Sequence, residues 1–141
     1  MTTLQQVRGI YERVVIDAAA PVPAYVENQD AVQFQELSEY AFVRVNFGMM
    51  QEANVGCEAT EHIRGSLVCE IYTKKGTGPG RGLEIAQPVI QALSALNAIT
   101  APAGQLITAR TGRIVGPTQA HLQERPHHFT RFSCAIYARV P

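Results

Sequence analysis

The alternation of residues 62–73 constrains the fold more than any other feature of the chain. Apolar side chains and one glycine take every second position, and polar side chains take most of the others. The first set is Ile63, Gly65, Leu67, Cys69 and Ile71. A period of two predicts a β-strand whose two faces differ in polarity.

Three further segments predict strands, and a short extended piece precedes them at residues 23–28. Residues 40–47 and 129–140 alternate in the same way, and residues 105–111 give a shorter strand. Residues 48–61 and 112–128 show little periodicity. We therefore expect two long connecting loops there, either mobile or folded over a neighbouring subunit.

Two segments predict amphipathic helices. Residues 3–17 carry apolar side chains at helical spacing, and the following AAAPVP ends that helix because proline cannot continue the hydrogen-bond ladder. Residues 83–96 carry a broad apolar stripe, in which Pro88 predicts a kink or a late start of the helix, and Asn97 predicts its end.

The order of these elements is helix, strands, helix, strands, without a regular βαβ rhythm. This order predicts an α+β fold, an antiparallel β-sheet with two α-helices packed on one face. The 141 residues and 15.4 kDa suit a single domain spanning residues 1–141. The N-terminal segment has no unbroken apolar core, so we expect no signal peptide, no membrane partner and a cytoplasmic origin.

The charge balance excludes a strongly basic binding protein. Twelve basic residues match twelve acidic ones, so any site for a polyanion would have to be local. Charged residues make up 17% of the chain, which is less than usual for a small protein. We infer that copies of the same chain cover part of the surface.

Cysteine and histidine give no catalytic or metal-binding pattern. Cys57, Cys69 and Cys134 are odd in number, widely spaced and without a CxxC pair, which argues against a disulfide framework and a zinc site. Cys69 and Cys134 fall within strand patterns and predict buried thiols. His127 and His128 are adjacent, and adjacent strand residues point to opposite faces. With no GxSxG or HExxH motif, we expect neither an enzyme, a metal nor a cofactor.

The run KKGTGPGRG, residues 74–82, joins the second predicted strand to the second helix. It fails as a phosphate loop because no Lys-Ser or Lys-Thr follows the glycines, and it fails as a dinucleotide fingerprint because Arg81 or Leu83 takes the third glycine position. A flexible turn, an anion site at the helix N-terminus and a local nucleic-acid contact extended by Arg64, Arg131 and Arg139 remain open.

The central stretch from Phe42 to Leu96 resembles the tail-terminator-like proteins of long-tailed bacteriophages, a phage-related domain family of unknown function. The likeness rests on an Arg-Val strand core, a pattern similar to R-x-G-x-[LV]-x-[VI]-x-[VI]-[YF], a glycine-rich turn and an alanine-rich helix. The matching positions are Arg44, Val45, Arg64, Gly65, Leu67, Cys69, Ile71, Tyr72, Gly76, Gly78, Gly80, Gly82 and residues 83–96.

This resemblance implies a structural subunit rather than a catalyst. A tail terminator forms a ring, typically a hexamer, which caps the tail tube protein, stops its polymerisation and offers a surface to head-completion proteins. It would reside in the virion tail after assembly in the cytoplasm of the bacterial host. A head-tail connector or a minor tail protein of the same fold is the closest alternative.

With the resemblance added, the glycine-rich run becomes a candidate contact with another subunit or with the tube. Glycines let backbones approach closely, and the basic side chains would pair with a partner's acids. Two methionines in the preceding loop would suit an adaptable contact. The predicted contact residues are Lys74, Lys75, Gly76, Gly78, Gly80, Arg81, Met49 and Met50.

Overall fold

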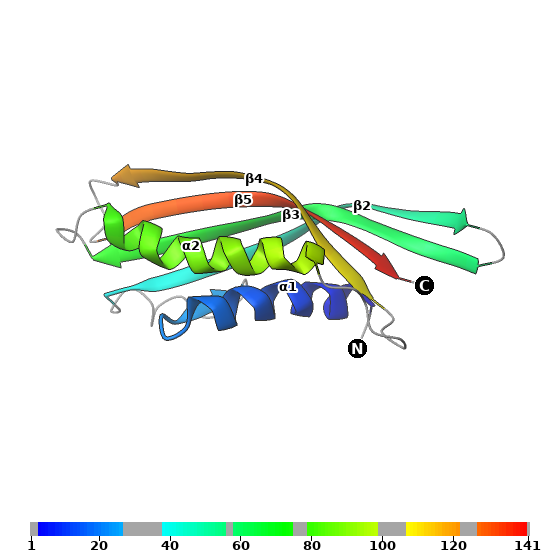
Figure 1. Ribbon diagram of the computed structural model, residues 1–141, viewed down its shortest axis with the longest axis horizontal. Coiled ribbons are helices and arrows are strands. Elements are labelled where there is room, and N and C mark those ends of the chain that lie inside the picture. Colours follow the sequence, from blue (N-terminus) through cyan, green and yellow to red (C-terminus); the bar gives the residue numbers. More distant parts are fainter. Residues whose placement is uncertain are drawn as a thin grey trace.

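A computed structural model describes residues 3–26, 38–55, 58–74, 79–98, 107–121 and 127–140. These residues form two α-helices, a short 3-10 helix and five β-strands (Figure 1). The elements are α1 (Thr3–Ala19), β1 (Ala24–Val26), β2 (Tyr40–Val55), β3 (Glu58–Lys74), α2 (Gly80–Ala95), η2 (Leu96–Ala98), β4 (Thr108–His121) and β5 (His127–Val140).

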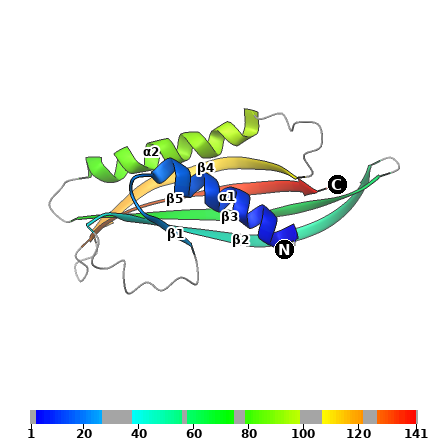
Figure 2. The same cartoon turned by 90° about the horizontal axis from the view of Figure 1, so that it is seen from below.

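The five strands form one sheet in the order β1-β2-β3-β5-β4. The pairs β2–β3, β3–β5 and β4–β5 are antiparallel, and only the short β1 runs parallel to its neighbour β2. Figures 1 and 2 show both helices on the same side of the sheet. The predicted α+β fold, with a mainly antiparallel sheet and two helices on one face, is confirmed.

The core lies between the helices and the sheet, where the two periodicities meet. Helical spacing buries Val7, Tyr11 and Val15 on α1, and it buries the apolar stripe predicted for α2 in the same way. The strands contribute every second residue to the same layer. The largest fully buried side chains from α2 and the sheet are Val89, Leu93, Val43, Val45, Ile63, Leu67, Ile71, Phe132 and Ile136.

Tyr11 reaches from α1 into the ladder between β4 and β5. Arg110 lies directly opposite Tyr137 there. The Arg110 N–H donates to the Tyr11 hydroxyl at 3.1 Å, and the hydroxyl lies 2.6 Å from the Arg110 carbonyl and 2.9 Å from the Tyr137 carbonyl, to either of which it can donate. Burial raises the pKa of Tyr11 to about 12. One side chain therefore ties the first helix to the last two strands.

The two predicted long loops are wrong, because most of their residues lie in strands. Residues 48–55 extend β2 and residues 58–61 begin β3, while residues 112–121 extend β4 and residues 127–128 begin β5. A register shift between Phe47 and Met49 forms a bulge at Gly48, and β2 continues beyond it. Two further shifts interrupt the register of the edge strand β4, one between Thr111 and Ile114 and one between Val115 and Thr118. The second contains Gly116, whose φ is +105°, and Pro117, which an edge strand tolerates.

The helix boundaries also differ from prediction. α1 continues to Ala19, and α2 begins at Gly80, before the predicted start, with Pro88 inside it on the exposed side. Gly82 in the first turn packs against the fully buried Thr130, whose hydroxyl would collide with any Cβ at that position. This close approach favours a helix start rich in glycine.

Candidate functional site

The face of the sheet that points away from the helices is the candidate functional site, and we call it the open face. No helix among the described elements covers it (Figures 1 and 2). It consists of the alternate residues that the core does not use. These are Tyr40, Phe42, Arg44 and Asn46 on β2, His62, Arg64, Ser66, Val68, Glu70 and Tyr72 on β3, and His127, Phe129, Arg131, Ser133, Ala135, Tyr137 and Arg139 on β5.

An aromatic cluster occupies one end of the open face. The rings of Tyr40 and Tyr72 stack with centroids 4.6 Å apart, and Phe129 packs against Tyr72 at 5.4 Å. His127 meets the tyrosine rings edge-on at 5.3 Å and 6.3 Å. The Tyr72 hydroxyl donates to the Glu70 carboxylate at 3.0 Å. The cluster buries Tyr72 and His127 almost completely, so this end is firmly packed.

Exposed arginines and apolar rings share the rest of the open face. The guanidinium of Arg44 lies 5.9 Å from the centre of the Phe42 ring, and that of Arg64 lies 5.8 Å from the centre of the Tyr137 ring. Tyr137 remains 43% exposed. Tyrosine, phenylalanine and arginine are the residue types that protein interfaces concentrate.

The glycine-rich run is only partly described. Lys74 is the exposed last residue of β3, and Gly80 and Arg81 open α2. Lys75, Gly76 and Gly78 lie outside the described residues. The α2 N-terminus has no side-chain cap.

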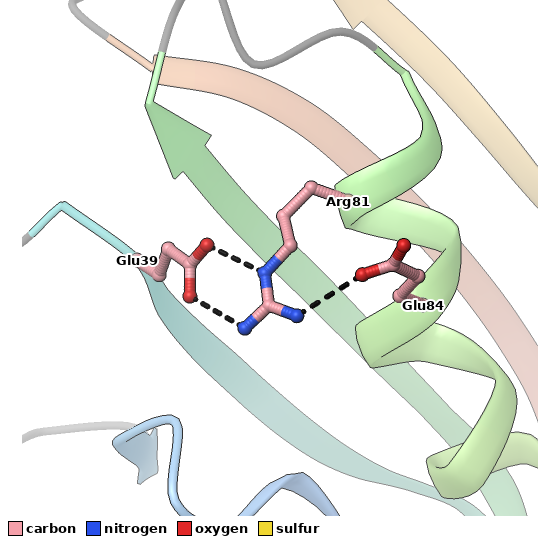
Figure 3. Close-up of polar contacts among 3 residues, drawn as sticks. All are labelled: Glu39, Arg81 and Glu84. Carbon is pink, nitrogen blue, oxygen red and sulfur yellow. Dashed lines mark hydrogen bonds and ion pairs between the residues drawn. The ribbon is translucent and has the colours of Figure 1, made fainter.

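Arg81 has partners within its own chain (Figure 3). Its Nε donates to Glu39 at 2.6 Å and its Nη2 donates to the same carboxylate at 2.9 Å, while Nη1 reaches Glu84 at 3.2 Å. These bonds lower the pKa of Glu39 and raise that of Arg81. The pair joins the start of α2 to the start of β2, so a partner's acid would compete with Glu39 for this guanidinium.

Met49 and Met50 belong to β2 rather than to a loop. Their backbones pair with Arg64 and Ile63 of β3, just beyond the bulge. Their side chains lie outside the described part of the chain, and their role in a contact stays a prediction.

A shallow open hollow of about 370 Å³ marks the same bulge. It is lined by Asn46, Phe47, Gly48, Arg64, Gly65 and Ser66. A Cβ at Gly65 would collide with the Asn46 carbonyl. With Arg64 as its single ionisable side chain, the hollow offers no acid-base pair for catalysis.

The buried thiols and the histidines do not assemble a reactive centre. Cys69 and Cys134 lie on the helix side, where burial raises the pKa of their thiols to about 12 and about 11, so they are almost fully protonated at neutral pH. Cys57 lies outside the described residues. Within the described ranges, no three His, Cys, Asp or Glu side chains gather as a metal site.

The alternation in the sequence predicts two faces on each strand, but it does not predict the open face as one continuous surface. Aromatic and basic residues interleave on this surface once β3 lies beside β5, because Arg64 pairs with Tyr137 across the two strands. The alternation of residues 129–139 carried this signal, but the neighbouring strand had to be known.

Comparison with known proteins adds information on the fold alone. No family model and no curated protein matches the chain. Twenty-five chains of solved structures match this chain. The name of one of them states neither an activity nor a partner. That structure superposes with a TM-score of 0.56 at 14% identity, over 100% of this chain and 97% of its own. None of the described helices has the length and apolar character to span a bilayer.

Proposed function

We propose that this protein is a structural assembly subunit, a tail terminator of a long-tailed bacteriophage. In this function a ring of identical subunits caps the tail tube, stops its polymerisation and presents a surface to the head-completion proteins. The single observation that carries the proposal is the open face, a sheet surface that none of the described helices covers and that has the composition of a protein interface. The resemblance described for residues 42–96 supplies the class of assembly.

The energetics of the open face support association. The chain leaves Val115 on the adjacent edge strand 60% exposed and Tyr137 43% exposed. Each Å² of apolar surface removed from water contributes roughly 25 cal/mol, so covering these side chains with a partner stabilises the complex. Arginines paired with rings can retain hydrogen-bonding capacity for a partner's acids.

The chemistry of the described residues supports a non-catalytic role. The hollow at the bulge has one ionisable residue, and the two described thiols are buried and protonated. The open face instead provides area, which is what an assembly subunit requires. A head-tail connector or a minor tail protein of the same fold would use the same surface.

A binding module for nucleic acid is the second candidate, and the arginines of the open face favour it. Positive charge beside aromatic rings is how proteins bind single strands. Against it, Arg44 and Arg64 already lie over rings, and Tyr40 stacks on Tyr72. Rings engaged in this way offer less surface to a nucleobase, so we favour assembly.

Light scattering across a concentration series tests the proposal. We expect one discrete oligomer, with a central hole in negative-stain images, because a closed ring fixes the copy number. Added to polymerising tail tube protein, the oligomer should bind tube ends and limit tube length. A chain that stays monomeric and instead binds short DNA with a steep salt dependence would contradict the proposal and favour the second candidate.

A further inference from the structure

The β2–β3 hairpin projects from the body of the protein as an arm. Figures 1 and 2 both show it extending past the helices and the other strands. The pairing of β3 with β5 begins at Glu61, opposite Val140. Beyond that point, residues 53–55 and 58–60 pair only with each other in the described part of the sheet. We call residues 52–55 and 58–61 the arm, with the Glu52–Glu61 pair at its base.

A two-stranded ribbon of this kind has little stability of its own. Isolated hairpins are marginally stable at best in water, and their outer edges carry unpaired backbone groups. Packing on a further surface would stabilise the ribbon.

The charge of the arm indicates what that surface is. Its residues include Glu52, Glu58 and Glu61, and neither lysine nor arginine. Glu52 and Glu61 are direct partners in the hairpin register. Like charges directly opposite one another destabilise an antiparallel pair. A basic surface beside the arm would remove this repulsion.

The open face has the complementary charge. Its positions include the exposed Arg44, Arg64, Arg131 and Arg139 against one acid, Glu70, whose carboxylate accepts a hydrogen bond from within the chain. The whole chain has a formal net charge of zero. The charges are therefore segregated, with an acidic projection and a basic face on the same molecule.

We propose that the acidic arm of one copy docks on the basic open face of the next copy. The arm cannot reach the open face of its own chain, because it continues the strands β2 and β3 that form this face. Two different surfaces then meet at each contact, and a head-to-tail contact of this type closes into a ring when the rotation between subunits allows it. The inference rests on the proposed function and specifies the contact that builds the ring.

Reciprocal charge reversal tests the docking. The arm variant carries Glu52→Lys and Glu61→Lys, which keeps a like-charged pair across the hairpin. The face variant carries Arg64→Glu and Arg139→Glu, at positions that do not pair directly with a described acid. A control variant, Asp17→Lys with Gln87→Lys and Gln91→Lys, adds the same charge as the arm variant on exposed helix positions.

We expect each reversed variant alone to assemble at least about tenfold more weakly than wild type, because like charges then face each other at every contact. The control should assemble as wild type does. An equal mixture of arm and face variants should assemble again, since the basic arm meets an acidic face and the acidic arm meets a basic face. Circular dichroism of each variant establishes that it is folded.

Three results would overturn the docking. A wild-type ring whose two reversed variants also form rings refutes this contact and leaves the proposed function standing. Folded variants that fail alone and also fail when mixed place the contact elsewhere. A wild-type chain that is monomeric at every concentration contradicts both, and if the face variant then loses affinity for short single-stranded DNA while the arm variant does not, the open face binds nucleic acid.

Discussion

Replacing Tyr11 with phenylalanine tests how the helices hold the sheet. Tyr11 is fully buried, and its hydroxyl occupies the ladder between Arg110 of β4 and Tyr137 of β5. Phenylalanine keeps the ring but removes the hydroxyl. The Arg110 N–H then loses its hydrogen-bond acceptor, and the nearby carbonyls lose a donor.

The expected cost follows from these lost bonds. A buried polar group left without its partner costs about 1–3 kcal/mol of unfolding free energy. The unfolding entropy is roughly 2.1 cal/mol/K per residue, which for 141 residues makes 1 kcal/mol equivalent to about 3 °C in Tm. We therefore expect Tyr11→Phe to lower Tm by about 3–10 °C.

The assay is urea or thermal unfolding followed by circular dichroism, with Tyr137→Phe as the matched control. The control removes the same atom from a half-exposed ring and should change stability by less than about 0.5 kcal/mol. Equal stabilities of the two variants would refute the structural role assigned to Tyr11.

The pH dependence provides a second check on the same residue. The folded state raises the pKa of Tyr11 from 10.0 to about 12. The stabilisation from a neutral Tyr11 is therefore fully present below pH 10 and is lost as the pH rises toward 12. The advantage of wild type over Tyr11→Phe should shrink across this window, and a constant difference would show that Tyr11 ionises as freely in the folded state as in the unfolded chain.

Three further predictions concern other contacts. Gly65→Ala should cost about 1–3 kcal/mol in urea unfolding because its Cβ meets the Asn46 backbone, whereas Gly48→Ala in the same bulge, 3.8 Å from its nearest atom, should change stability by less than about 1 kcal/mol. Glu39→Gln should lower the free energy of unfolding by up to about 1 kcal/mol at pH 7. This difference from wild type should disappear as the pH falls from 4.5 through the lowered pKa of Glu39, because the wild-type carboxylate then becomes protonated. Cys69 and Cys134 should resist maleimide at pH 8 until the protein unfolds, as peptide mass spectrometry would reveal, and equal labelling of folded and unfolded protein would contradict their burial.

The layered fold could be predicted from the sequence because burial imposes periodicity. The positions of Leu67 and Ile71 on β3, and of Val7 and Val15 on α1, repeat at the spacing that places them against one another. Where a segment has one face in the core, its pattern predicts both its type and its orientation.

The arm could not be predicted in this way. Residues 53–55 and 58–60 pair with each other through backbone hydrogen bonds beyond the end of β5, with no helix among the described elements packed over them. Backbone pairing leaves no alternation in the sequence, so the segment looked like a loop. The Glu39–Arg81 pair was missed for a related reason, since it joins residues 42 positions apart that only the tertiary fold brings together.

The continuity of the arm with β2 and β3 has a consequence for assembly. Because β2 and β3 form the arm and also a large part of the open face, the twist of those strands fixes the angle between them. Each arm-to-face contact would then rotate the next subunit by the same amount. Repetition of one angle gives a ring of one size, or an open filament if the angle does not close. Assemblies of several sizes would instead favour a contact that does not use these two strands.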